Sequence, residues 1–117
     1  MAKGFYSLIQ FCPNSFRAEA VNVGLAVVYS DSHPVRVRLT STYDRARKLF
    51  GITEPERENF KIAAEAIQHR IEELQTPEDL SAFASSRAND LRLTEPRFAK
   101  IQDLDSDFER LFSQLVD

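Results

Sequence analysis

The polar residues of greatest chemical interest gather at the start of one predicted strand, in the stretch FRAEAVNVGLAVVYS. Arg17 and Glu19 lie two residues apart just before the strand, and Asn22 and Gly24 lie two apart within it. An Asn in a buried strand needs hydrogen-bond partners, and a Gly there indicates a bulge or a close backbone approach. These side chains could satisfy one another and pin the first hairpin, or line a groove for a peptide or small polar ligand. On the residues alone we favour the first interpretation.

A basic zone within residues 35–50 is a second candidate surface. Its cationic residues are Arg36, Arg38, Arg45, Arg47 and Lys48. They could contact nucleic-acid phosphates, with Tyr6 or Tyr43 stacking on a base. The net charge of −3 argues against nucleic-acid binding, because the protein as a whole would repel phosphates. The acidic residues from position 103 onward could instead pair with the basic zone, within the molecule or across an interface.

Signatures of enzymes and cofactors are scarce. The chain has only three Gly residues, which leaves no Gly-rich phosphate loop. Cys12, His33 and His69 stand far apart without the spacing of metal ligands. Glu19 could act as an acid or base, but nothing in the sequence singles out a second carboxylate for it. We therefore expect no metal and no other cofactor, and we favour a non-enzymatic protein.

The elements that position these residues begin with three strands, at residues 5–12, 21–29 and 35–39. The second strand is apolar on both faces, which is typical of a central strand. Simple alternation puts Val23 and Leu25 on one of its faces and Asn22 and Gly24 on the other. The third strand is expected to turn its two arginines outward. The short connections between the strands predict an antiparallel meander.

Capping patterns and apolar residues at three- and four-residue steps predict helices after the strands. The expected helices are 43–50, 53–75, 76–88 and one capped by Ser106 and Glu109 that runs to residue 115. A short strand over 91–94 precedes the last helix. This order predicts a single α+β domain over residues 1–117. We expect an antiparallel sheet of three to four strands, covered on one face by about four helices and joined by the late strand.

The bulk composition predicts the compartment. A single cysteine fits a reducing environment. No segment approaches the ~18 uninterrupted apolar residues that a membrane helix requires. We expect a cytoplasmic protein that does not enter a membrane, and homo-oligomers are compatible with the sequence.

The stretch YSLIQFCPNSFRAEAVNVGLAVV resembles the start of a bacterial family of small proteins of unknown function. Its signature, Arg-(Gly/Ala)-Glu-x-hydrophobic-Asn-hydrophobic-Gly, is matched from Arg17 to Gly24. A second family segment, hydrophobic-x-hydrophobic-(Ser/Thr)-x-Pro-Arg, is matched over 91–97 and ends at Pro96 and Arg97. Gly24 and Pro96 are expected to be structural, whereas Arg97 joins Arg17, Glu19, Asn22 and the basic zone as candidate binding residues.

The resemblance implies no agreed activity, cofactor or catalytic residue. It does imply a partner, because genes of this family often lie beside one for a kinase that resembles the HipA toxin kinase. We therefore expect a protein-interaction module that is a partner or antitoxin-like regulator of a HipA-like kinase. The alternative is a protein that binds or processes nucleic acid through the basic zone.

Overall fold

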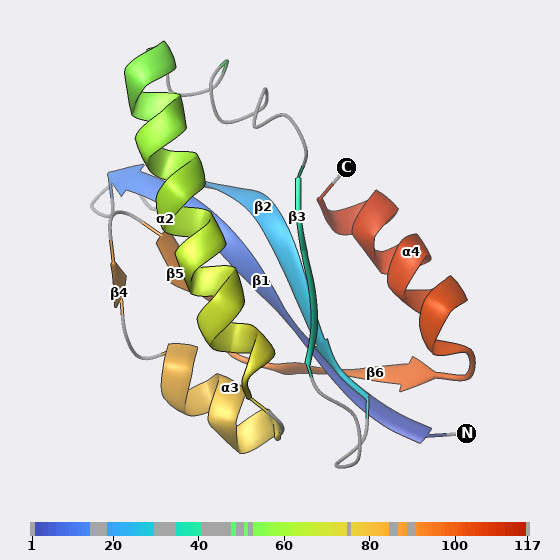
Figure 1. Ribbon diagram of the computed structural model, residues 1–117. Helices are drawn as coiled ribbons and strands as arrows, with labels where there is room; N and C mark the ends of the chain where they lie inside the picture. The colour runs from blue at the N-terminus through green and yellow to red at the C-terminus, as the bar shows by residue number, and fades with distance from the viewer. Residues whose placement is uncertain are drawn as a thin grey trace.

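The computed structural model describes residues 2–14, 19–29, 35–40, 48, 51, 53–74, 76–84, 87–88 and 91–116. Within them, one antiparallel sheet of six strands is packed by three helices (Figure 1). The strands are β1 (Ala2–Asn14), β2 (Glu19–Val28), β3 (Arg36–Leu39), β4 (Arg87–Ala88), β5 (Leu91–Leu93) and β6 (Arg97–Ile101). The helices are α2 (Glu54–Glu72), α3 (Pro77–Ala84) and α4 (Leu104–Leu115). The α+β class and the initial strand meander are confirmed. The helix expected over 43–50 lies outside the described residues, except for Lys48, which is helical.

The long strand β1 organises the sheet. The strand order is β3-β2-β1-β5-β4, and β6 pairs with the amino-terminal part of β1 on the same side as β5. The late strand expected over 91–94 is thus confirmed as β5, whereas β6 was not expected. Between β5 and β6, Thr94 donates its backbone N–H to the carbonyl of Leu8, and its side-chain oxygen accepts the N–H of Leu8. This double contact keeps the chain on β1 across Pro96, which has no N–H to donate.

A bulge in β2 changes which side chains face which layer. Ile9 of β1 lies opposite Gly24, but Gln10 lies opposite Asn22, so Val23 is an extra residue in β2. An extra residue inverts the alternation of a strand from that point on. The residues expected on a single face therefore divide into Val21 and Val23 on one side of the sheet and Leu25 and Val27 on the other. The simple alternation was wrong beyond the bulge.

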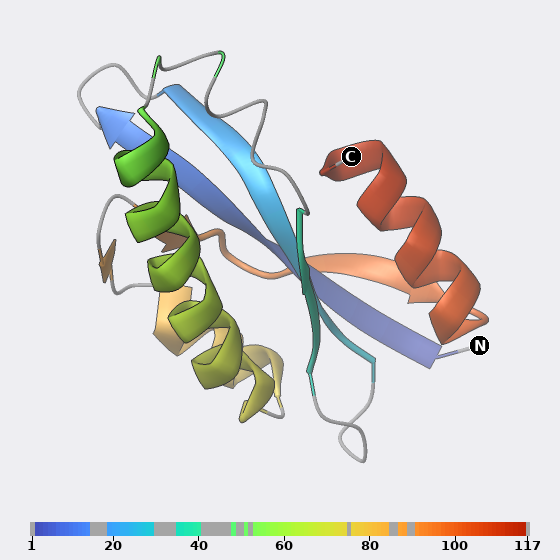
Figure 2. The ribbon, with the colours of Figure 1, turned by 45° about the horizontal axis from the view of Figure 1, so that its top comes forward.

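The helices cover both faces of the sheet, so the expectation of a single covered face was wrong (Figures 1 and 2). Helices α2 and α3 pack on one face, where Ala64, Ile71 and Leu80 are fully buried. Helix α4 packs on the other face through Phe108, Leu111 and Phe112. Strand β2 is apolar on both sides and therefore needs cover on both. Burying a Val or Leu side chain contributes about 1.5–3 kcal/mol to the free energy of folding, which would be lost on an uncovered face.

Helix α4 begins earlier than its sequence indicates. Asp103 occupies the position before the helix, and Ser106, expected as the cap, lies within it and donates its hydroxyl to the Asp103 carboxylate at 2.6 Å. The carboxylate of Asp107 instead turns back and accepts the backbone N–H groups of Gln102, at 2.8 Å, and Asp103, at 3.2 Å. These two hydrogen bonds lower the pKa of Asp107 below its ordinary value.

Candidate functional site

The structure describes some of the expected binding residues only in part. Arg17, Arg45 and Arg47 lie outside the described residues. Glu19 begins β2, and its backbone pairs with that of Asn14, but its side chain also lies outside the description. Lys48 is exposed. The expected contact between Arg17 and Glu19 therefore falls outside the described residues, while the other candidates can be placed.

Asn22 is held at both ends of its amide by other parts of the protein. Its Oδ1 accepts a hydrogen bond from Nε2 of Gln10 at 2.8 Å, and its Nδ2 donates to the backbone carbonyl of Leu115 at 3.0 Å. Gln10 in turn accepts a hydrogen bond from Nε of Arg92 at 2.9 Å. This polar row, Arg92–Gln10–Asn22, crosses β5, β1 and β2 and ends on α4. The last carbonyls of a helix lack partners within the helix, so Asn22 satisfies one of them and fastens α4 to the sheet.

Gly24 lies where two neighbouring strands close over β2. A Cβ at this position would lie 2.9 Å from Cδ2 of Leu39 and 3.0 Å from Cδ1 of Ile9. Ordinary carbon contacts are about 3.5–4.0 Å, so any larger residue would displace these side chains. The structure thus gives Gly24 the close approach that the sequence indicates, directly beside the bulge.

The two arginines of β3 contact α4. Arg36 pairs with Asp105 at 2.5 Å, and Arg38 pairs with Glu109 at 2.6 Å. The hydrogen bond from Arg38 is the main reason why the pKa of Glu109 lies below its ordinary value. The sequence left open whether the basic zone and the acidic residues pair within the molecule or across an interface. These two pairs form within the molecule. All four side chains are exposed, so solvent screens both ion pairs and each contributes little to stability.

The same arginines also lie over aromatic rings of α4. The guanidinium carbon of Arg38 is 5.2 Å from the ring centroids of both Phe108 and Phe112, and that of Arg36 is 5.6 Å from Phe108. These distances are typical of cation–π contacts. The expected outward orientation of Arg36 and Arg38 is therefore correct in that both are exposed, but both also pack along α4.

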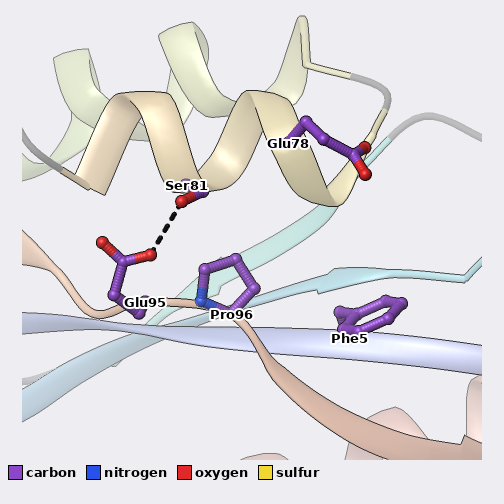
Figure 3. A pocket seen from close by; sticks show the side chains of 5 residues that line it. All are labelled: Phe5, Glu78, Ser81, Glu95 and Pro96. Carbon is purple, nitrogen blue, oxygen red and sulfur yellow. Dashed lines mark hydrogen bonds between the residues drawn. The ribbon is translucent and has the colours of Figure 1, made fainter.

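Pro96, the proline expected to be structural, belongs to another surface. Pro96 lines an open depression of about 240 Å³ between α3 and the sheet. Its other lining residues are Phe5, Glu78, Ser81 and Glu95 (Figure 3). Ser81 donates its hydroxyl to Oε2 of Glu95 at 2.8 Å, and among the described residues no cation pairs with Glu78 or Glu95. We call this hollow the acidic depression.

The strand next to this depression has an exposed aromatic residue. Phe98 of β6 is 54% exposed, and its ring meets that of Phe5 edge to face, with centroids 6.1 Å apart. Arg97 is exposed and lies opposite Tyr6, on the other face of the sheet from Phe98. Sequence reasoning missed Phe5, Glu78, Glu95 and Phe98 as a group, because only the return of β6 along β1 and the docking of α3 bring them together.

Two observations on the described residues concern metal binding and nucleophilic chemistry. The described residues contain no group of three or more His, Cys, Asp or Glu residues that could hold a metal ion. Ser7 is fully buried, and its hydroxyl has no hydrogen-bond partner among the described residues. A buried hydroxyl without a neighbouring base lacks the activation that a nucleophile requires. No helix in the described part of the chain is both long and apolar enough to cross a membrane.

Comparison with known proteins adds a family. No curated protein and no solved structure gave a significant match. One protein family matches residues 6–116, which is nearly the whole of the sequence. The chain therefore belongs to the family described as "Protein of unknown function (DUF3037)".

Proposed function

We propose that this protein is a non-enzymatic interaction module and a partner or antitoxin-like regulator of a kinase that resembles HipA. The observation that carries the proposal is the way α4 is held. Arg36 and Arg38 contact the amino-terminal and middle parts of α4, and Asn22 binds the carbonyl of Leu115 at its end. Three of the expected binding residues thus fix a helix rather than surround an open site.

A helix fixed in this way presents its outer surface in a constant geometry. The exposed positions of α4 are Asp105, Ser106, Glu109, Arg110, Ser113 and Gln114. A surface that needs no ordering on binding loses less conformational entropy, which favours docking. Asp105, Asp107 and Glu109 are paired with Arg36, Arg110 and Arg38, so a partner would recognise the shape and the polar groups of this surface rather than a net charge.

The identity of the partner rests on the family resemblance. The gene association that this resemblance implies makes a HipA-like kinase the first protein to test. Nucleic-acid binding through the basic zone has less support, because Arg36 and Arg38 already pair with Asp105 and Glu109. A nucleic acid would have to compete with these acidic residues for the two arginines.

The proposal is tested by co-expressing the protein with a HipA-like kinase from the same genome and measuring the affinity of the purified proteins by calorimetry. Gln114→Lys adds a positive charge to the exposed surface of α4 and should weaken the complex about 3–10-fold, since about 1 kcal/mol corresponds to roughly fivefold. Asn59→Lys adds the same charge to an exposed position of α2, in the opposite layer, and should leave the affinity unchanged. If the two proteins do not form a complex, or if both variants weaken it equally, α4 is not the docking surface.

A further inference from the structure

Strand β6 has an unpaired edge. It pairs with β1 on one side, and among the described residues no backbone hydrogen bond reaches its other side. Such an edge presents N–H and carbonyl groups that can pair with another strand. Figure 1 shows β6 extending with β1 away from α2 and α3, so these helices do not cover its far end.

The side chains of β6 give this edge a definite chemistry. Phe98 and Lys100 alternate with Arg97 and Ala99 and therefore share one face of the strand. This is the face of Phe5 and of the acidic depression. Phe98 is one of two large apolar side chains exposed in the described part of the chain, and Lys100 is also exposed. This face therefore has a regular order along the chain: the acidic depression at Pro96, an aromatic ring at Phe98 and a cation at Lys100, each two residues after the one before.

When a second copy of β6 lies antiparallel to the first, the cation of each copy lies opposite the acidic depression of the other. We propose that a second copy of the chain docks on β6 by antiparallel strand pairing centred on Phe98, which gives a two-fold symmetric dimer with a continuous sheet. In this register Phe98 faces Phe98 of the second copy, and Lys100 lies opposite Pro96 of the second copy. The ammonium group of Lys100 then reaches the acidic depression, where Glu78 and Glu95 have no cationic partner among the described residues.

Symmetry makes each favourable contact occur twice. In a two-fold interface the same patch serves both copies, so the Lys100 contact forms at both ends of the paired strands. Directly opposite side chains have Cβ atoms about 4.5–5.5 Å apart, close enough for the two Phe98 rings to pack together. A register centred on Ala99 would instead place Lys100 opposite Phe98 and leave the acidic depression without a cation. The charge pattern therefore selects the register centred on Phe98.

The test measures the mass of the full chain by sedimentation equilibrium over a range of concentrations. The natural protein should dimerise, and Lys100→Glu should weaken the dimer by at least about tenfold, because two attractive contacts become repulsive. The double variant Lys100→Glu/Glu95→Lys exchanges the charges and should restore most of the affinity. Lys61→Glu makes the same change at an exposed position of α2 and should have no effect. Circular dichroism checks that each variant is folded.

Three results would overturn the second copy as the occupant of β6. The first is a natural protein that stays monomeric at all concentrations. The second is a dimer that both Lys100→Glu and Phe98→Ser leave intact, since its interface would lie elsewhere. The third is a natural protein that is monomeric and binds the kinase, together with β6 variants such as Lys100→Glu that no longer bind it. This result would assign the edge of β6 to a strand of the kinase. A Lys100→Glu monomer that still binds the kinase would support the dimer and keep it separate from docking on α4.

Discussion

The side chain of Asn22 connects three elements, because it lies on β2 and forms hydrogen bonds to β1 and to α4. Its amide receives a hydrogen bond from the neighbouring strand and donates one to the end of a helix that is far away in the sequence. Serine, threonine or aspartate could not make both hydrogen bonds in the same way, because the donor and the acceptor must be on the same planar group. An asparagine at position 22 therefore has a structural explanation in this chain.

At this scale we predict the effect of Asn22→Leu. The substitution leaves the carbonyl of Leu115 and the amide of Gln10 without a partner and should lower the free energy of unfolding by about 1–3 kcal/mol. Urea unfolding measures the change. The same substitution at Asn59, which is exposed on α2, should change the stability by about 0.5 kcal/mol or less. Equal stability of the two variants would show that the Asn22 hydrogen bonds are unimportant.

At the scale of elements, β3 and α4 are joined by groups that titrate. The hydrogen bond and charge of Arg38 lower the pKa of Glu109 from its ordinary value of 4.5, and backbone hydrogen bonds lower that of Asp107 from 3.8. A carboxyl group whose pKa is lowered by folding stabilises the folded state above its unfolded pKa. That contribution is lost as the pH falls through the folded pKa.

We therefore predict that the protein loses stability as the pH falls below about 4.5, in part through Glu109. Glu109→Gln should be less stable than the natural protein at neutral pH and should lose less stability on acidification, because the titrating group is gone. Urea unfolding at neutral pH and near pH 3 measures both effects, and Glu65→Gln on the exposed side of α2 is the control. An unchanged pH dependence in Glu109→Gln would contradict the assigned role of the Arg38–Glu109 pair.

The elements also show what could be predicted from the sequence. Helices α2 and α3 have clear capping residues at Thr53 and at Thr76–Pro77, and both begin where the sequence predicts. The end of α3 was wrong, because α3 ends at Ala84 and the last expected helical residues, Arg87–Ala88, form strand β4, which pairs with β5. The start of α4 was misplaced, because Asp107 caps it from within the helix. Strand β6 was missed, because Pro96 indicates an end of pairing and the contact of Thr94 with Leu8 is not visible in the sequence.

At the scale of the whole molecule, two apolar layers share one sheet. Ile71 and Leu80 belong to the layer under α2 and α3, and Phe108 and Phe112 belong to the layer under α4. The sequence predicts which residues are apolar in each helix. It does not predict that the helices divide between the two faces, because the bulge at Val23 decides which face Leu25 and Val27 supply.

Because β1 and β2 contribute to both layers, we predict that the protein unfolds in a single cooperative transition. Phe108→Ala should lower the free energy of unfolding by about 3–5 kcal/mol, and Ile71→Ala, in the opposite layer, by about 2–5 kcal/mol. Circular dichroism and tyrosine fluorescence, measured on the same urea series, should give coincident curves for both variants. Separate transitions for the two layers would contradict this prediction.

The double contact between Leu8 and Thr94 joins residues that are 86 positions apart. During synthesis β1 leaves the ribosome well before its neighbours β5 and β6. Until these emerge, one edge of β1 and the apolar residues of the α4 face have no native partners. Folding that depends on contacts so distant in sequence is slow and leaves strand edges open to aggregation. The nascent chain should therefore depend on chaperones until β5, β6 and α4 have emerged.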